Sequence, residues 1–414
     1  MVNRSVQRCS VLLVAVLMVA GVACQPSRAG VRCRGGVARD ASHLLVCQRG
    51  RWVRSITLAQ VAQILVNARN GENPPIDVDT VASGLSRPWE VAFLPDGTPL
   101  VTERTGRLLA LRGERQVVFA PADVQVVGEG GLMGLAVDPG YAANRRVYVC
   151  LRSTVAGGPD VRVARLELNA AGTGVVTRTD IVGGIPAGNT HVGCRLKFGP
   201  DNALWISTGD ANLGAGPQSG ASLAGKILRV TPDGAAAPGN PGGVLDPRIF
   251  TFGHRNPQGL AFRSAPGTVE DGRPYSVEHG PDTDDEVNRL VAGGNYGWNP
   301  IGGGGVYNQA VPMTASGAIG AVWRSGSPTV APSGAAFVQG QEWRNWSGAL
   351  VVANLKATRL QVLRLSADGA GVVSDSVALT DRGRLRSVVQ GPAGALYVVT
   401  DSDNGSLLRL RPRS

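Results

Sequence analysis

A recurring strand pattern is the feature that most limits how this chain can fold. An apolar stretch that ends in Phe or Val is followed by a turn rich in Pro, Asp and Gly, and then by a second apolar stretch. The clearest copies are VAFLPDG at residues 91–97, LKFGPD at residues 196–201 and VVQGP at residues 388–392. With three weaker copies, the first stretches end at residues 93, 137, 198, 262, 337 and 389. The chain therefore holds six copies of one unit, roughly 59 residues apart on average.

A repeat of this length, built from short strands and tight turns, is typical of a propeller blade of about four strands. One blade cannot bury both of its faces alone, so a closed ring is the stable arrangement. The 57 Gly and 26 Pro among 414 residues favour many turns and argue against a helical bundle. We therefore predict an all-β fold, a six-bladed β-propeller over residues 76–414 with a small N-terminal extension. The strand expected at residues 76–82 has no complete unit of its own and could close the ring by pairing into the last blade.

The N-terminus has the pattern of an export signal. Two arginines precede an apolar run at residues 11–23, which is too short to span a bilayer as a helix. The GVAC sequence that ends at Cys24 resembles a bacterial lipobox, in which this cysteine would carry a lipid anchor. We predict a signal peptide over residues 1–23 and an exported protein. It is either an envelope lipoprotein or a secreted or periplasmic protein, and a lipid on Cys24 would be its only membrane contact.

Residues 24–75 are expected to form a small extension and linker. Apolar residues at 44–47 and 52–53 predict a hairpin, and helical spacing predicts a helix over residues 55–68. Removal of the leader leaves five cysteines, and four of them if Cys24 carries lipid, an even number in an oxidising compartment. Cys33 and Cys47 close a short loop and are the first expected disulfide, which leaves Cys150 and Cys194 as the second.

The charge distribution excludes some classes of partner. The formal charge is +10, from 41 basic and 31 acidic residues, and only three of the basic residues are Lys. The cations are scattered singly rather than clustered with aromatic residues, so we expect no nucleic-acid partner. A nicotinamide enzyme is disfavoured because GEGGLMG at residues 128–134 leads into a strand and has no strand-to-helix context.

Three histidines lie in loops rich in Gly, Asn and Arg, at comparable places in successive repeats: His191, His254 and His279. The last loop continues into an acidic run at residues 282–286. That run is either a solvated loop or part of a Ca²⁺ site, because Ca²⁺ prefers carboxylate and carbonyl oxygens. The loops, rather than the strands, are therefore where we look for chemistry.

Taken together, these loops resemble those of the soluble PQQ-dependent glucose and aldose sugar dehydrogenases. The motifs are GHRNPQGL at residues 253–260, GP…DDEVN at residues 280–288 and GGNYGW at residues 293–298. The resemblance covers about residues 78–410 and excludes residues 24–75. It implies oxidation of the C1 hydroxyl of an aldose to the lactone, with hydride transfer to PQQ and assistance from Ca²⁺.

The resemblance also implies roles for individual residues. His191 matches the general base that removes the hydroxyl proton, a task that suits an imidazole with an ordinary pKa of about 6.5. Arg255 matches the residue that polarises the quinone oxygen, and Asn256 matches a cofactor contact. The other implied cofactor contacts are Glu129, Lys356, Arg384 and Arg386. Gly280 and Pro281 match carbonyl ligands of the catalytic Ca²⁺, and Glu286 and the Tyr296 carbonyl match a second, structural Ca²⁺ site.

Glu129 departs from the family pattern, because the glucose dehydrogenases have Gln at this place. A carboxylate beside an anionic cofactor repels it unless the carboxylate is hydrogen-bonded or protonated. We favour the broader aldose dehydrogenase branch, which varies here. Two other readings stay open: a non-catalytic envelope propeller that binds a carbohydrate or protein partner, and a Ca²⁺-dependent hydrolase or lactonase. The sequence identifies neither the aldose nor the electron acceptor.

Overall fold

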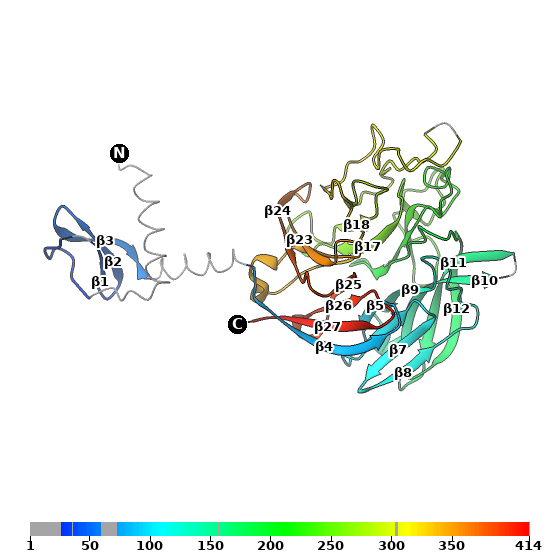
Figure 1. Cartoon of the computed structure of the whole chain (residues 1–414), viewed down its shortest axis with the longest axis horizontal. Coiled ribbons are helices and arrows are strands. Elements are labelled where there is room, and N and C mark those ends of the chain that lie inside the picture. Colours follow the sequence, from blue (N-terminus) through cyan, green and yellow to red (C-terminus); the bar gives the residue numbers. More distant parts are fainter. Residues whose placement is uncertain (1–25, 35, 59–72, 156, 303–304, 414) are drawn as a thin grey trace. The chain divides into compact units, whose positions relative to one another are not determined.

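The computed structural model describes residues 26–34, 36–58, 73–155, 157–302 and 305–413 (Figure 1). The chain divides into two compact units, residues 1–73 and residues 74–414. The expected signal peptide and Cys24 lie outside the described residues. Within the described residues, no helix is long and apolar enough to cross a membrane.

The N-terminal unit contains a three-stranded antiparallel sheet of β1 (Val37–Arg39), β2 (His43–Gln48) and β3 (Arg51–Thr57). The predicted hairpin is confirmed as β2–β3, and the Cys33–Cys47 disulfide is also confirmed. The predicted start of a helix at residue 55 is wrong, because β3 continues in register until Thr57 pairs with His43. Sheet pairing prevails there over the helical spacing of the apolar residues. Most of the remainder of that helix lies outside the described residues.

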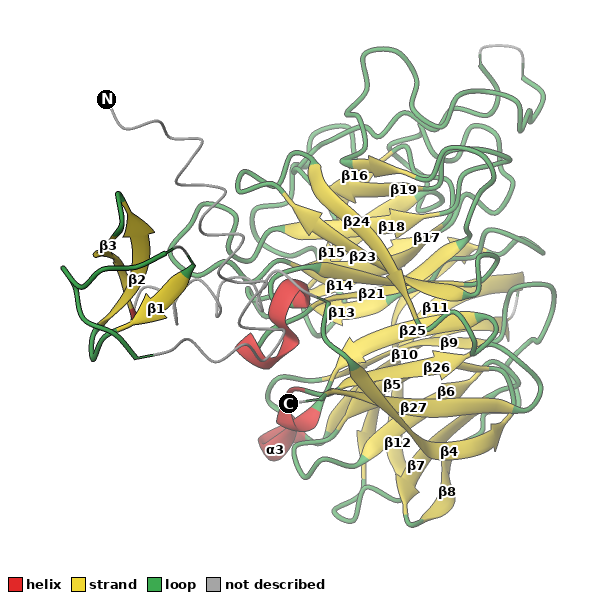
Figure 2. Ribbon diagram, turned by 60° about the vertical axis from the view of Figure 1, so that its left-hand side comes forward, coloured by secondary structure: helices red, strands yellow, loops and turns green. Residues whose placement is uncertain are grey.

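The described residues of the larger unit form six four-stranded antiparallel sheets (Figure 2). The first is β5 (Pro88–Phe93), β6 (Pro99–Glu103), β7 (Arg107–Arg112) and β8 (Glu114–Phe119). The second is β9 (Leu132–Val137), β10 (Arg146–Val155), β11 (Gly158–Leu168) and β12 (Val175–Pro186). The third is β13 (Leu196–Phe198), β14 (Leu204–Thr208), β15 (Lys226–Val230) and β16 (Ile249–Phe252). The fourth is β17 (Pro257–Phe262), β18 (Pro274–Glu278), β19 (Glu286–Arg289) and β20 (Trp323–Arg324).

The fifth sheet is β21 (Pro332–Phe337), β22 (Leu350–Asn354), β23 (Arg359–Leu365) and β24 (Val372–Ala378). The sixth is β25 (Leu385–Gln390), β26 (Leu396–Thr400), β27 (Gly405–Pro412) and β4 (Ile76–Leu85). Helical segments in the described part are short: α3 (Tyr141–Asn144), η1 (Gln341–Trp346) and η2 (Pro392–Gly394). The predicted all-β fold is therefore confirmed.

The repeated stretches of the sequence are the inner strands of the ring. The first strand of each sheet contacts the first strand of the next, and β25 contacts β5. These strands end at or within one residue of the six predicted positions, since five end at residues 93, 137, 198, 262 and 337, and β25 ends at Gln390. Each inner strand is followed by the turn and second apolar stretch that the repeat predicted. The sheets thus form a closed, propeller-like ring.

The ring closes through the strand at its N-terminal end. β4 pairs antiparallel with β27, so that Val78 lies opposite Leu410 and Thr80 lies opposite Leu408. This confirms the expectation that residues 76–82 complete the last sheet. Chain segments from the two ends of the unit therefore share one sheet.

The hydrophobic core is divided among the interfaces between sheets. Each of six buried clusters found among the described residues joins two consecutive sheets, and the one between the second and third sheets also includes Trp89 of the first. One of them joins the last sheet to the first, with Val399 and Leu407 packed with Val91 and Val101. Because each sheet buries both faces against its neighbours, opening the ring exposes two apolar faces at once.

Candidate active site

One mouth of the ring collects the polar loops that the sequence singled out. All six inner strands begin at this mouth, and the candidate residues lie just before them or at their first positions. Glu129 precedes β9, His191 precedes β13, Arg255 and Asn256 directly precede β17, and Arg384 directly precedes β25. The fold thus brings together residues up to about 250 positions apart in the sequence.

His191 is held in place by a buried carboxylate. Its Nδ1 lies 2.8 Å from Oδ1 of Asp210, and the His191 side chain is 8% exposed while that of Asp210 is fully buried. The other oxygen, Oδ2, accepts hydrogen bonds from Tyr307 Oη and Trp298 Nε1, both at 2.7 Å. A carboxylate only accepts, so Nδ1 donates and Nε2 of the neutral ring carries the lone pair. Nε2 has no hydrogen-bond partner among the described residues.

Glu129 connects two of the candidate residues. Its Oε2 accepts a hydrogen bond from the backbone N–H of His191 at 2.9 Å and another from Asn256 Nδ2 at 3.2 Å. Asn256 in turn accepts a hydrogen bond from the Gly193 N–H at 3.2 Å. The carboxylate is therefore hydrogen-bonded, which is one of the two conditions under which it can lie beside an anion.

Arg255 lies at the same mouth and has no carboxylate partner in the described part of the chain. Its Nη1 and Nη2 donate to the carbonyl of His279 at 3.1 Å and to Oε1 of Gln309 at 2.6 Å. Its guanidinium carbon lies 5.4 Å from the centre of the Trp298 ring. Burial lowers the pKa of Arg255 from its ordinary value, because the charged form is partly desolvated. This positive charge is thus held by neutral groups and is available to an anion.

His279 is kept neutral by its surroundings. Burial, reinforced by the charges of Arg255 and Arg386, lowers its pKa to about 3. Its Nε2 is buried, and no described residue forms a hydrogen bond with it. The Nε atoms of Arg255 and Arg386 are also buried and unpartnered within the described residues. Three buried nitrogens near one mouth are therefore left for groups that the chain itself does not supply.

Arg384 and Arg386 share one acceptor, Asp401. Oδ2 of Asp401 lies 3.0 Å from Nη2 of Arg384 and 2.8 Å from Nη2 of Arg386. Burial alone would raise the pKa of this carboxyl, but the two guanidinium groups hold it below its ordinary value. Arg386 also donates to Gln258 at 2.7 Å and is buried, whereas the Arg384 side chain is half exposed. Two cations on one carboxylate leave a net positive charge here.

Lys356 and the Gly280–Pro281 pair lie on either side of the segment at residues 329–331. The exposed Lys356 ammonium donates to Thr329 Oγ1 at 2.8 Å, and its backbone N–H donates to the Val330 carbonyl. On the other side, buried Asp285 accepts hydrogen bonds from the N–H groups of Ala331, at 2.8 Å, and Gly280, at 2.9 Å. No N–H of the described residues donates to the carbonyls of Gly280 and Pro281.

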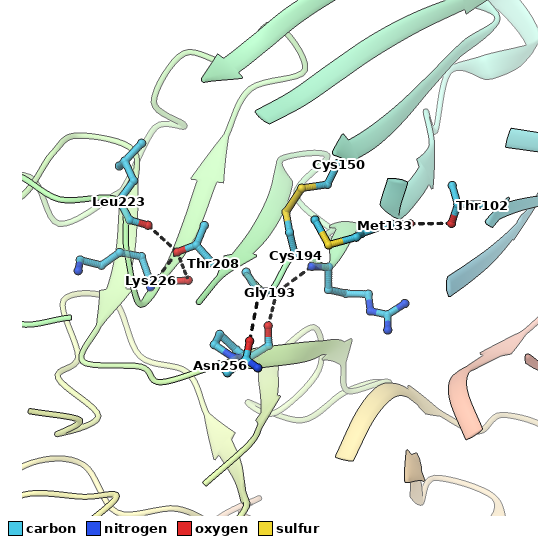
Figure 3. Close-up of a disulfide and its surroundings, with 12 residues drawn as sticks. Thr102, Met133, Cys150, Gly193, Cys194, Thr208, Leu223, Lys226 and Asn256 are labelled. Atoms are coloured by element: carbon cyan, nitrogen blue, oxygen red, sulfur yellow. Dashed lines mark hydrogen bonds between the residues drawn. A yellow bond between two sulfur atoms is a disulfide. The ribbon is translucent and has the colours of Figure 1, made fainter. Parts of the chain in front are cut away.

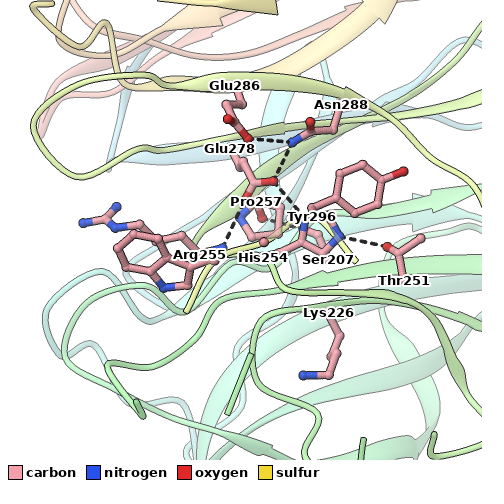
Figure 4. Close-up of polar contacts among 12 residues, drawn as sticks. Ser207, Lys226, Thr251, His254, Arg255, Pro257, Glu278, Glu286, Asn288 and Tyr296 are labelled. Carbon is pink, nitrogen blue, oxygen red and sulfur yellow. Dashed lines mark hydrogen bonds and ion pairs between the residues drawn. The ribbon is translucent and has the colours of Figure 1, made fainter. Parts of the chain in front are cut away.

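Glu286 and Tyr296 lie in a separate buried network (Figure 4). Glu286 accepts hydrogen bonds from Thr314 at 2.7 Å and Asn288 at 3.2 Å, and burial together with Glu278 raises its pKa to about 7. His254 is fully buried between Thr251 and Glu278, at 2.8 Å from each, and stacks on Tyr296. His254 therefore supports the fold and does not join the group around His191.

A disulfide holds the chain at Cys194, three residues after His191 in the sequence (Figure 3). Cys150 of β10 is bonded to Cys194, as predicted, with their Cα atoms 6.3 Å apart. Both cysteines are fully buried, and the bond joins β10 of the second sheet to the loop that leads into β13 of the third. Lys226 Nζ donates to the carbonyls of Gly216 and Ala224 at 2.7 and 2.6 Å, and the backbone N–H of Lys226 donates to Thr208 Oγ1 at 3.0 Å. Thr208 ends β14 two residues before Asp210, so Lys226 holds the segment next to that carboxylate.

The sequence did not single out three residues that the structure places in this site: Asp210, Tyr307 and Asp401. Asp210 directly follows a Gly at the end of a buried strand, as Asp401 directly follows β26. A charged residue that ends an apolar strand at the mouth of the ring was the available signal for both. Tyr307 lies 97 residues from Asp210 in a Gly-rich loop and had no local signal.

No cluster of three or more His, Cys, Asp or Glu side chains arranged to hold a metal ion occurs among the described residues. The expected Ca²⁺ ligands are mostly backbone carbonyls, which such a cluster does not include. The unpartnered carbonyls of Gly280 and Pro281 are therefore the relevant feature.

The chain is similar to known sugar dehydrogenases. The sequence model of the Glucose / Sorbosone dehydrogenase family matches residues 85–409. Aldose sugar dehydrogenase YliI of Escherichia coli K12 is 33% identical, over 82% of this chain and 94% of that protein. Quinoprotein glucose dehydrogenase B of Acinetobacter calcoaceticus is 25% identical, over 86% of this chain and 93% of that protein. The PQQ-bound aldose sugar dehydrogenase of Streptomyces coelicolor is 32% identical and superposes with a TM-score of 0.68, over 82% of this chain and all of that one.

Proposed function

Because the chain belongs to the glucose/sorbosone dehydrogenase family, we propose that it is a PQQ-dependent dehydrogenase that oxidises the C1 hydroxyl of aldose sugars to the lactone. The observation that carries this proposal is the pairing of His191 with Asp210 at one mouth of the ring, next to buried Arg255, which has no carboxylate partner in the described part of the chain. A base and a fixed positive charge at one place are what alcohol oxidation by hydride transfer requires.

His191 is the general base of the proposed reaction. Asp210 orients the ring and stabilises the imidazolium that forms when Nε2 takes the proton of the C1 hydroxyl. Tyr307 and Trp298 hold the second oxygen of Asp210, so the carboxylate keeps its position during the reaction. The resemblance and the hydrogen-bond pattern thus agree on the same histidine.

The residues at this mouth fit a tricarboxylate quinone. Arg384, Arg386 and Lys356 supply positive charge for its carboxylates, and buried nitrogens of Arg255, Arg386 and His279 have no hydrogen-bond partner among the described residues. When bound, PQQ supplies the quinone that accepts hydride from the sugar. Arg255 then stabilises the negative charge that develops on an oxygen near its guanidinium. Asn256 and Glu129, which are hydrogen-bonded to each other, are the other proposed polar contacts of the cofactor.

Ca²⁺ fits the carbonyls of Gly280 and Pro281. These two oxygens accept no hydrogen bond from the described residues, and Asp285 fixes the backbone of Gly280. The carbonyls of Gly280 and Pro281 would hold a Ca²⁺, which would supply a Lewis acid at this mouth. Glu286 and the Tyr296 carbonyl are the proposed second Ca²⁺ site, where a cation would offset the repulsion between Glu286 and Glu278.

The remaining parts of the proposal concern the whole protein. The six four-stranded sheets support a six-bladed propeller at residues 76–414, preceded by a separate extension at residues 24–75. The N-terminal pattern supports a signal peptide at residues 1–23 and export, with Cys24 as the candidate lipid anchor. The electron acceptor is not assigned.

The test is dye reduction by the purified mature protein across a panel of aldoses, with PQQ and Ca²⁺ added separately and together. We expect turnover only when both are present, its loss in EDTA, and its loss in His191→Ala. The matched histidine control is His43→Ala in the N-terminal unit, which should keep full activity. Binding of PQQ without turnover on any aldose would overturn the reaction, and absence of PQQ binding would favour the non-catalytic envelope propeller.

A further inference from the structure

The channel between the inner strands contains a cavity that the proposed dehydrogenase site does not use. Its volume is about 460 Å³, and its lining comes from the inner strands of all six sheets. A wider hollow of about 960 Å³ shares Lys197, Phe198 and Gln390 with it. The hollow is lined by Phe198, Phe262 and Phe337, the last residues of three inner strands. Because His191 precedes the first residue of such a strand, the hollow lies at the opposite mouth.

A layer of buried polar side chains closes the inner end of this cavity. Arg195 forms an ion pair with Glu90, and Ser387 donates a hydrogen bond to the same carboxylate. Arg195 also donates to the Gln258 carbonyl at 2.8 Å and lies 4.0 Å from the centre of the Trp89 ring. The charge of Glu90 is thus already neutralised within this layer.

Lys197 is the charged residue common to the cavity and the outer hollow. Its ammonium has no hydrogen bond or ion pair with any described residue, whereas Lys226 donates to three carbonyls and Lys356 to Thr329. The described charged residues that line the smaller cavity are two cations and one carboxylate, and that carboxylate is paired with Arg195. One positive charge in a largely apolar cavity is therefore unbalanced.

We propose that this cavity is a binding site for a small organic monoanion, a carboxylate with a short apolar chain, whose carboxylate pairs with Lys197. A volume of this size lies in the range of small-ligand sites, with apolar walls and few polar groups. Phe93, Phe198 and Val389 line the space that the apolar chain would occupy.

The charge of the cavity selects the ligand class. A monoanion balances the single unpaired cation, whereas a dianion would leave a buried negative charge and a neutral ligand would leave the ammonium unpaired. Burial, only partly offset by Glu90, also lowers the pKa of Lys197, and a bound carboxylate would favour its charged form. The site is independent of the proposed PQQ chemistry.

The test is isothermal titration of the full purified protein with sodium hexanoate and, separately, with hexanamide, which has nearly the same shape but no charge. We expect one hexanoate per chain and no heat from hexanamide. Lys197→Met, which keeps the length of the side chain and removes the charge, should weaken hexanoate binding about tenfold or more. Arg39→Met, which removes an exposed cation of the N-terminal unit that lines neither this cavity nor the outer hollow, should bind hexanoate as the unaltered protein does.

A soak of crystals in 6-bromohexanoate gives a second measurement that does not depend on a variant. We expect bromine density inside the inner-strand channel beside Phe198, with the carboxylate at Lys197. Equal hexanoate affinity in Lys197→Met, equal binding of hexanamide, or bromine only at the mouth near Arg386 would each overturn the proposal.

Discussion

Asp210 is the residue whose contacts bear most directly on the proposed chemistry. It bonds to His191 Nδ1 through one oxygen and to Tyr307 and Trp298 through the other. An Asn at this position can donate as well as accept, so it can reverse the tautomer of His191 and leave Nε2 protonated. We expect Asp210→Asn to lower kcat roughly 10²- to 10⁴-fold while PQQ affinity changes little. A titration of PQQ binding beside the kinetics separates this result from a loss of the cofactor.

For Glu129, unlike Asp210, we expect the matching amide substitution to keep the activity. Its Oε2 accepts from the His191 N–H and from Asn256. The carbonyl oxygen of a Gln can accept the same two hydrogen bonds without the negative charge. We therefore expect Glu129→Gln to keep the sugar turnover and to bind PQQ several-fold more tightly, measured by titration at low ionic strength, where charge effects are largest. Weaker PQQ binding in this variant would show that the carboxylate is needed and not merely tolerated.

The loop that leads into β13 carries the base, and the Cys150–Cys194 disulfide is its covalent support. The bond closes a loop of 44 residues between two sheets. Loop-closure entropy for this length corresponds to about 4 kcal/mol of stability. We expect Cys150→Ala/Cys194→Ala to lose stability on this order in denaturant unfolding. The double variant of Cys33 and Cys47 is the matched control, and it should leave the unfolding of the larger unit unchanged.

The closure of the ring is a property of the whole molecule, and it depends on β4. Removal of residues 1–73 deletes the N-terminal unit but keeps every strand of the ring, so we expect a folded, monodisperse protein. Removal of residues 1–86 also deletes β4 and leaves the edge of β27 unpaired. We expect that shorter chain to aggregate or to unfold at a markedly lower temperature, measured by light scattering and calorimetry. Equal stability of the two truncated chains would contradict a ring closed by β4.

The difference between local signals and long-range contacts explains what could be predicted from the sequence. The ends of the inner strands were predictable, because an apolar strand followed by a Pro/Asp/Gly turn is a local signal that recurs in every sheet. The pairing of β4 with β27 was predictable because a seventh incomplete unit had no other partner. Asp210 and Tyr307 were not, because a long loop of the fourth sheet brings Tyr307 to Asp210 of the third, 97 positions away, and no spacing rule relates the two residues. The helix expected from residue 55 was wrong because tertiary pairing of β3 outweighed local periodicity.

The central claim is that His191 removes the proton as the C1–H bond of an aldose is broken. Single-turnover reduction of the PQQ-loaded protein by glucose carrying hydrogen or deuterium at C1 tests it most directly. We predict a spectral change that is slowed several-fold by deuterium and is nearly abolished in His191→Ala, although that variant still binds PQQ. Reduction at an equal rate with both isotopes, or at an equal rate in the variant, would contradict the assignment of the base and the reacting carbon.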